Sequence, residues 1–138
     1  MSDKTFIDTN VLIYAHDADS GAKQARAKGI LLDLWADRCG VLSTQVLQEF
    51  YVNVTRKIAQ PLPKPTARLI LASYALWCAV ITSAELDLAF RIEDEARIGF
   101  WDALIVASAV RSGAARILSE DLNNKQIIAG LRIENPFL

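Results

Sequence analysis

The sequence predicts an α/β domain with a central parallel sheet of about five short strands and helices on both faces. Short apolar runs alternate along the chain with longer segments whose apolar residues recur at helical spacing. Strands that alternate with helices in this way are typical of parallel sheets. The 138 residues, of which 52% are apolar, suffice for one domain spanning 1–138 with its own core.

In the first half of the chain, the pattern predicts two strands and three helices. The strands are expected to end at Asp8 and to cover 41–43, and the helices to cover 10–16, 22–37 and 44–59. Turn-forming residues at 17–21 separate the first two helices. The third helix has one polar face, formed by Gln45, Glu49, Asn53 and Arg56.

The second half opens with a proline-rich segment at 60–65, which is stiff but too short to separate domains. Helices are expected over 66–78, 84–97 and 102–111, and strands over 80–82, 116–119 and 131–133. Residues 99–101 are expected to link the last two helices. The helix over 102–111 is apolar nearly all round, so it should be central and covered on most sides.

Charge and hydropathy exclude several classes of protein. The 15 basic side chains nearly balance 16 acidic ones, so bulk positive charge cannot hold a nucleic acid. The apolar runs near 69–81 and 103–110 are shorter than the ~18 residues that a membrane span needs. Without a secretory signal at its start, the chain is expected to be cytoplasmic. The mean hydropathy of +0.21 is high for a small domain, so some apolar residues can lie on the surface and contact a partner or a second copy of the chain.

The cysteines, the single histidine and the tryptophans have structural explanations. Cys39 and Cys78 match neither a paired metal motif nor a disulfide framework and are expected to be small buried hydrophobes. His16 near a helix end is expected to interact with the terminal carbonyls rather than to act in catalysis. Packing is favoured over base stacking for the three tryptophans, and Trp101 can also shape the rim of a site beside Asp102.

Four carboxylates fall where the ligand site of a parallel sheet is expected, beyond the carboxyl ends of its strands. Asp8 closes the first strand, Glu49 lies on the helix after the second, Asp102 opens the apolar helix, and Asp121 follows the fourth strand. Taken singly, each has a structural explanation. Asp8 and Asp102 can cap helices, Glu49 can be solvated, and Asp121 can form a turn.

The joint placement of these acids favours chemistry. Converging carboxylates repel one another, so such a cluster persists at neutral pH only if a cation neutralises it or some of its members bind protons. Oxygen ligands without His or Cys favour Mg²⁺ or Mn²⁺ over zinc. The same ions attract a phosphate backbone, so an acidic protein can act on nucleic acid without a basic surface.

Five segments carry a resemblance to a known family. They are Phe6–Leu12, Ser43–Phe50, Trp101–Ala109, Leu118–Leu122 and Ile133–Phe137. In this order they resemble a PIN-domain protein of the VapC toxin type. No single segment is specific, but the ordered set covers residues 5–137. The resemblance implies a single, three-layer PIN-like domain.

The resemblance also implies a metal-dependent ribonuclease. In the family, an acidic quartet holds one or two Mg²⁺ or Mn²⁺ ions, which activate water for attack on an RNA phosphodiester bond. Here Asp8 would be the central ligand, Glu49 and Asp102 would complete the main site, and Asp121 would be more peripheral. Because family members vary near the last position, Glu120, Asn123 or Asn124 could also take part.

Further residues are implied as supports of this site. Thr9 and Asn10 would orient Asp8 and leave both of its oxygens free for metal, and Asn124 would be another supporting residue. Basic side chains could contact phosphate, although solvated surface charge is favoured for each. These candidates are Arg56, Lys57, Arg91, Arg97 and Arg111.

The leading functional hypothesis is an endoribonuclease toxin that cleaves RNA, is held inactive by a cognate antitoxin protein and forms a homodimer. The alternatives are a PIN-like module that binds RNA or a partner without cutting, and a housekeeping RNA-processing nuclease. A phosphotransfer domain of the haloacid-dehalogenase type is disfavoured. That type has a second Asp two residues after the first, and here that position is Asn10.

Overall fold

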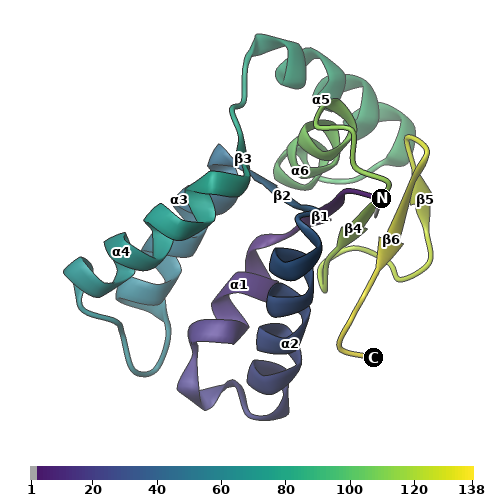
Figure 1. Ribbon diagram of the computed structural model, residues 1–138. Coiled ribbons are helices and arrows are strands. Elements are labelled where there is room, and N and C mark those ends of the chain that lie inside the picture. The colour runs from purple at the N-terminus through teal and green to yellow at the C-terminus, as the bar shows by residue number, and fades with distance from the viewer. Residues whose placement is uncertain (1–2) are drawn as a thin grey trace.

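The computed structural model describes residues 3–138 and has a six-stranded, mostly parallel sheet with helices on both faces (Figure 1). The strand order is β3-β2-β1-β4-β6-β5. The strands are β1 (Thr5–Ile7), β2 (Gly40–Ser43), β3 (Cys78–Ala79), β4 (Arg116–Leu118), β5 (Ile127–Ile128) and β6 (Leu131–Glu134). All neighbouring pairs are parallel except β5 and β6. The predicted α/β class is confirmed.

Helices α1 and α2 lie on one side of the sheet, and α5 and α6 lie on the other (Figure 1). The helices are α1 (Thr9–His16), α2 (Ala22–Asp37), α3 (Thr44–Val52), α4 (Lys64–Tyr74), α5 (Ser83–Ala96) and α6 (Phe100–Arg111). Short 3₁₀ turns cover Ala18–Ser20 and Ala75–Trp77, and a π-helical turn over Asn53–Lys57 continues α3. Among residues 3–138, no helix is long and apolar enough to cross a bilayer.

The core follows the apolar pattern of the sequence. Every residue of β1 is buried, and β1 lies between β2 and β4 with Phe6 opposite Val41 and Ile117. In α6, residues 103–109 are all buried, which confirms that this helix is central. Burial of these apolar side chains stabilises the sheet and fixes the positions of its strand ends.

Several expected element boundaries are wrong, three of them for clear local reasons. The third strand forms at 78–79 rather than 80–82, because Thr82 instead caps α5 through a reciprocal capping box with Glu85. Helix α4 begins at Lys64, since Pro65 is tolerated in the first turn of a helix. Helix α6 begins at Phe100 after Gly99 at the N-cap, so 100–101 are not a link.

Strand β5 was not predicted because it has only two residues. It forms an antiparallel hairpin with β6 through the turn Ala129–Gly130, in which φ is 51° and 81°. Positive φ at both positions is the geometry of a type I′ hairpin turn, for which Ala is an uncommon residue. A turn signal was therefore absent from the sequence.

The structure shows the surroundings of His16 and of the two cysteines. The His16 ring lies 2.7 Å from the hydroxyl oxygen of Tyr74 and packs edge-on against Phe50. The expectation that it bonds to the carbonyls at the end of α1 is wrong, because the ring turns toward α4. Cys39 is buried as expected, whereas Cys78 is half-buried, and both are free thiols.

Candidate functional site

The carboxyl ends of three adjacent strands deliver polar residues to one edge of the sheet. Asp8 directly follows β1, β2 leads directly into the helix that carries Glu49, and β4 leads to Ser119 and Asp121. The neighbouring helix α6 adds Asp102 in its first turn. This edge is where open parallel sheets bind ligands.

Asp8 is buried and its two carboxylate oxygens both accept hydrogen bonds. Oδ1 accepts the backbone N–H of Thr9 at 2.7 Å, so Asp8 is the N-cap of α1. Oδ2 accepts the hydroxyl of Ser119 at 2.7 Å. The expectation that both oxygens stay free is therefore wrong. Each carboxylate oxygen has a further lone pair, so capping leaves room for a cation.

Glu49 is joined to Asp8 through Thr9. Its Oε2 accepts the Thr9 hydroxyl at 3.2 Å, while the backbone N–H of the same threonine reaches Asp8. Its Oε1 accepts Nε2 of Gln45 at 2.7 Å. Glu49 is half-buried, so it is a bound member of this edge and not the free surface residue that it resembles when taken alone.

The same network reaches the other two acids. Nε2 of Gln45 also lies 3.3 Å from the backbone oxygen of Trp101, which precedes Asp102. The backbone N–H of Asp121 donates to the Ser119 hydroxyl at 3.1 Å. Asp102 is the third residue of α6 and not its cap. Hydrogen bonds thus connect the segments that carry all four predicted acids.

The electrostatics show that the acids are close. Burial raises the pKa of Asp8 to about 7 against the opposing effect of its hydrogen bonds from Ser119 and Thr9, and the charges of Asp121 and Glu49 raise it further. The pKa of Asp102 is also raised, by burial and then by Asp121 and Glu49. Asp8 and Asp102 therefore feel the same two neighbouring charges.

Other predicted residues lie outside this network. The Glu120 carboxylate bonds to the Tyr14 hydroxyl and to Nζ of Lys23 at 2.6 Å. Oδ1 of Asn124 accepts the backbone N–H of Asn135 at 2.8 Å. Within this loop, Asp121 and not Glu120 is therefore the residue whose charge acts on Asp8 and Asp102. Asn124 instead contacts the C-terminal segment.

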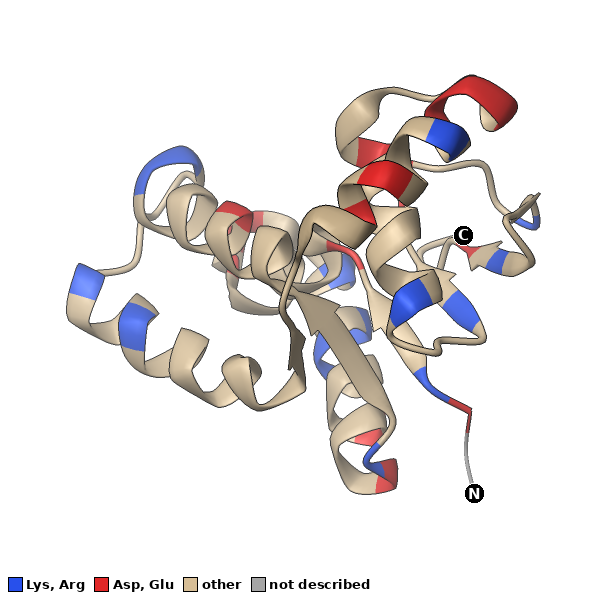
Figure 2. Cartoon of the chain, turned by 90° about the horizontal axis from the view of Figure 1, so that it is seen from above, with Lys and Arg blue, Asp and Glu red and all other residues tan. Residues whose placement is uncertain are grey.

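Basic residues make up little of the site. Arg111 lies at the far end of α6 and pairs with Glu85 at 2.8 Å. The other predicted phosphate contacts are exposed: Arg56 and Lys57 lie in the π turn after α3, Arg91 lies on α5, and Arg97 directly follows α5. Figure 2 shows basic residues at the outer end of the α3–α4 hairpin and acidic residues on α5.

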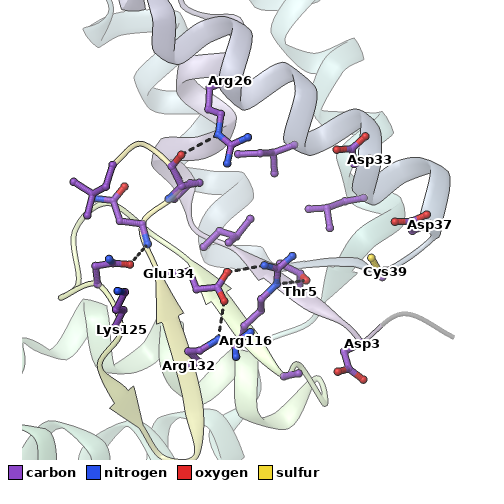
Figure 3. A pocket seen from close by; sticks show the side chains of 18 residues that line it. Asp3, Thr5, Arg26, Asp33, Asp37, Cys39, Arg116, Lys125, Arg132 and Glu134 are labelled. Atoms are coloured by element: carbon purple, nitrogen blue, oxygen red, sulfur yellow. Dashed lines mark hydrogen bonds and ion pairs between the residues drawn. The ribbon is translucent and has the colours of Figure 1, made fainter.

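A separate cavity of about 1180 Å³ lies between α2 and the C-terminal strands (Figure 3). Its charged floor is satisfied internally, because Glu134 pairs with both Arg116 and Arg132 at 2.6 Å. None of the four acids lines this cavity. It is therefore distinct from the acidic edge.

The acidic edge fits a divalent cation in its chemistry, although not as a closed cage. As the side chains stand, no group of three or more His, Cys, Asp or Glu in residues 3–138 is assembled for a metal ion. However, both side-chain heteroatoms of Asn10, two residues after Asp8, are buried without a partner, so Asn10 does not bond to Asp8 as expected, and Oε1 of Gln45 beside Glu49 is unpaired as well. Buried polar atoms are normally satisfied by water, an ion or a ligand. The oxygen-only donor set suits Mg²⁺ or Mn²⁺.

Sequence reasoning missed two members of the site, Ser119 and Gln45. Ser119 is fully buried, and Gln45 is 4% exposed despite its place on an apparently polar helix face. A small polar residue directly after a buried strand, next to the strand that ends in Asp8, was the available signal for Ser119. Gln45 lies one helical turn before Glu49, which was the signal for their contact.

Comparisons with known proteins agree with this geometry. A family model described as the PIN domain matches residues 5–128. A search of curated protein sequences gave no significant match.

Solved structures with the same fold include a toxin–antitoxin complex from Klebsiella pneumoniae, with a TM-score of 0.71, 19% identity, and coverage of 96% of this chain and 98% of that one. Mycobacterium tuberculosis VapC20, described as a sarcin–ricin loop cleaving toxin, has a TM-score of 0.61, 21% identity and coverage of 86% and 90%. FitAcB from Neisseria gonorrhoeae has a TM-score of 0.68, 17% identity and coverage of 96% and 98%. The family match covers most of the chain, and the chain therefore belongs to the PIN-domain family.

Proposed function

We propose that this protein is an Mg²⁺- or Mn²⁺-dependent endoribonuclease and the toxin of a toxin–antitoxin pair. The observation that supports this most directly is the hydrogen-bonded edge at which Asp8, Glu49, Asp102 and Asp121 meet in a PIN domain. The charges of Glu49 and Asp121 raise the pKa values of Asp8 and Asp102, and such repulsion costs stability unless a cation binds the acids. A purely structural role does not explain why all four acids lie at one edge of the sheet.

The residues at this edge would have two kinds of role, as metal ligands and as groups that position the ligands. Asp8 would be the central metal ligand, with Glu49 and Asp102 beside it and Asp121 at the open side. One or two bound ions would supply an activated water and stabilise the charge on the leaving oxygen. Ser119, Thr9 and Gln45 would hold the carboxylates in place, as the partners of metal ligands commonly do.

An RNA substrate is supported by the rim of the site. Trp101 directly precedes Asp102 and is 67% exposed, with its ring edge-on to Phe100 at 5.1 Å between centroids. An exposed indole beside a metal site offers a stacking surface to a base. Packing in the core or at an interface was expected for Trp101, and packing within the chain leaves most of its side chain uncovered.

A protein partner is supported by exposed apolar side chains on α2, α4 and the turn after α4. These include Leu32, Trp35, Leu69 and Leu76. One solved structure with this fold is described as a toxin–antitoxin complex, which supports a cognate antitoxin here. A homodimer is the second use that we propose for such apolar surface.

The test is cleavage of total RNA by purified protein with Mg²⁺, with Mn²⁺ and with EDTA. Wild type is expected to cut only with metal, whereas Asp8→Ala and Asp102→Asn should be inactive. Asp33→Asn, which removes an exposed carboxylate on α2, is the matched control and should cut like wild type. Equal cutting by wild type and both site variants would refute the enzymatic proposal.

A PIN-like binding module without catalysis is the second candidate. The observation that favours it is the absence, within residues 3–138, of an assembled metal-ligating group. Binding of Mn²⁺ to the wild-type protein, measured by electron paramagnetic resonance, separates the two. The nuclease should bind Mn²⁺ and lose that binding in Asp8→Ala, whereas a binding module should show none.

A further inference from the structure

The α3–α4 hairpin carries an uneven distribution of charge. Between residues 50 and 84 the sequence has four basic side chains, Arg56, Lys57, Lys64 and Arg68, and no Asp or Glu. The rest of the chain therefore has 11 basic residues, 15 minus 4, against all 16 acidic ones. Arg56 and Lys57 lie in the turn after α3 and Lys64 begins α4, and Figure 2 shows basic residues at this outer end of the hairpin. One element of an acidic protein is thus locally cationic.

The four cations are available to a ligand. All are exposed, and none of them forms an ion pair with a carboxylate in the part of the chain that the structure describes. The Arg68 guanidinium lies 5.9 Å from the centre of the Tyr51 ring, so its stem is placed along the hairpin. Basic side chains interleaved with an aromatic ring are typical of surfaces that bind single-stranded nucleic acid.

A π-helical turn connects this surface to the acidic edge. Over Asn53–Lys57 the helix widens, and the backbone N–H of Ile58 bonds to the oxygen of Asn53 at 3.1 Å. One α turn followed by one π turn uses about eight residues. Glu49, Asn53 and Lys57 therefore fall in line, with Nδ2 of Asn53 bonded to the Glu49 backbone oxygen at 2.8 Å.

This geometry corrects the polar face expected from sequence. A regular α-helix would align Arg56 with Glu49, whereas the π turn brings Lys57 into that line. Lys57 then lies two turns from Glu49, at a distance of about 11 Å along the helix axis. A chain of phosphates with one member at the acids can reach Lys57 and the hairpin beyond it.

We propose that the outer end of the α3–α4 hairpin is the RNA backbone-binding surface of this protein, with Lys57 nearest to the cleavage site. Arg56, Lys64 and Arg68 extend the surface away from the acids. The inference rests on the proposed ribonuclease function for its ligand. It places the phosphates on one side of the cut along α3 and the turn that follows it.

The test is binding of a single-stranded RNA oligonucleotide to metal-free protein in EDTA, measured by fluorescence anisotropy across a range of salt concentrations. Arg56→Ala/Lys57→Ala should weaken binding about 10-fold at low salt and lower the slope of log affinity against log salt by about 0.7 for each phosphate that the variant no longer neutralises. Lys64→Ala/Arg68→Ala should act in the same direction. Lys28→Ala/Arg38→Ala, which removes two exposed cations from α2 and its end, is the charge-matched control and should leave the slope unchanged.

Cleavage kinetics give a second readout. With Mg²⁺, Arg56→Ala/Lys57→Ala should raise KM and leave kcat unchanged, because these cations lie away from the reacting phosphate. Equal salt slopes in the hairpin and control variants would overturn the inference, even if wild type cuts RNA. Binding of an acidic peptide instead of RNA would overturn it in favour of a protein partner. Failure of metal-dependent cutting with RNA binding intact would instead count against the proposed catalysis alone.

Discussion

The Ser119 hydroxyl donates a 2.7 Å hydrogen bond to Oδ2 of Asp8 and so joins the end of β4 to the end of β1. Both residues are buried. The same hydroxyl oxygen accepts the backbone N–H of Asp121 at 3.1 Å. One small side chain therefore sets the distance between the central acid of the site and the loop that carries the fourth acid.

Ser119→Ala is expected to destabilise the protein in a pH-dependent way. Near pH 8 Asp8 is ionised, and loss of a hydrogen bond to a charged group should lower the free energy of unfolding by about 2 kcal/mol. Near pH 5 Asp8 is protonated, because its pKa is about 7, and the loss should approach the ~1 kcal/mol of a neutral bond. Urea denaturation of metal-free protein at both pH values measures the difference.

The matched control is Ser108→Ala. Ser108 is also buried, but its hydroxyl bonds to the neutral backbone oxygen of Leu104 at 2.8 Å. Its loss should cost the same at both pH values. An equal pH dependence in the two variants would mean that Ser119 does not act through the Asp8 charge.

The raised pKa of Asp8 predicts the sign of the pH dependence of wild type. Between the unfolded value of 3.8 and the folded value of about 7, the native state binds a proton that the unfolded state has lost. Stability of the metal-free protein should therefore fall as pH rises through this window, by at most about 4 kcal/mol. Thermal unfolding after chelation, followed across this range, measures the slope.

Asp8→Asn should flatten this dependence and stabilise the metal-free protein near pH 8, because a neutral amide costs less to bury than a carboxylate. Asp33→Asn, on the exposed face of α2, should retain the wild-type slope. Mg²⁺ or Mn²⁺ should raise the melting temperature of wild type near pH 8 and leave that of Asp8→Asn unchanged. A wild-type slope in Asp8→Asn would assign the effect to another group.

The spacing of apolar residues predicted the fold, because apolar residues recur at the positions where a helix or strand is buried. The predicted bounds of α2, 22–37, agree with Ala22–Asp37, and the burial of α6 follows from its apolar circumference. The four acids were found because parallel strands present their carboxyl ends at one edge. These are consequences of local pattern and of general sheet topology.

Side-chain partners could not be predicted in the same way. Ser119 and Asp8 are 111 residues apart, and no local pattern shows that β4 pairs with β1. The π turn at Asn53–Lys57 could not be predicted, because its residues also suit an ordinary helix. The sequence pattern therefore aligned Arg56 with Glu49, whereas the π turn aligns Lys57 with it. The paired state of Glu120 likewise depends on α1 and α2 folding over its loop.

Lys23→Gln is expected to loosen the loop that carries Asp121. Lys23 and Tyr14 hold the Glu120 carboxylate, which lies between Ser119 and Asp121 in the chain. Without Lys23, Glu120 would keep only its bond to Tyr14, so the loop that positions Asp121 would be held less firmly. Mn²⁺ affinity should fall about 10-fold, as it does when outer partners of metal ligands are removed, and amide hydrogen exchange in residues 119–122 should accelerate.

Arg132→Gln is the control for Lys23→Gln. It breaks an ion pair of the same length, 2.6 Å, between Arg132 and Glu134 on β6. Mn²⁺ affinity and exchange at 119–122 should stay at wild-type values in this variant. Lys23→Arg should retain the ion pair and the wild-type affinity for Mn²⁺. If Lys23→Gln and Arg132→Gln have the same Mn²⁺ affinity and the same exchange rates, the Lys23–Glu120 pair is a surface contact of little effect.

Trp101→Ala tests the stacking surface at the rim of the site. Because Trp101 is 67% exposed, its removal should cost little stability, while loss of a base-stacking partner should raise the KM for RNA about 10-fold. The kcat should change little, since Gln45 contacts the backbone oxygen of residue 101 and not its indole. Trp35→Ala, a partly exposed indole on α2 that packs on Trp77, should leave KM unchanged. If Trp101→Ala and Trp35→Ala have the same KM for RNA, the Trp101 indole does not stack on a base. If Trp101→Ala changes the oligomeric state in solution and not the KM, the indole contacts a protein surface.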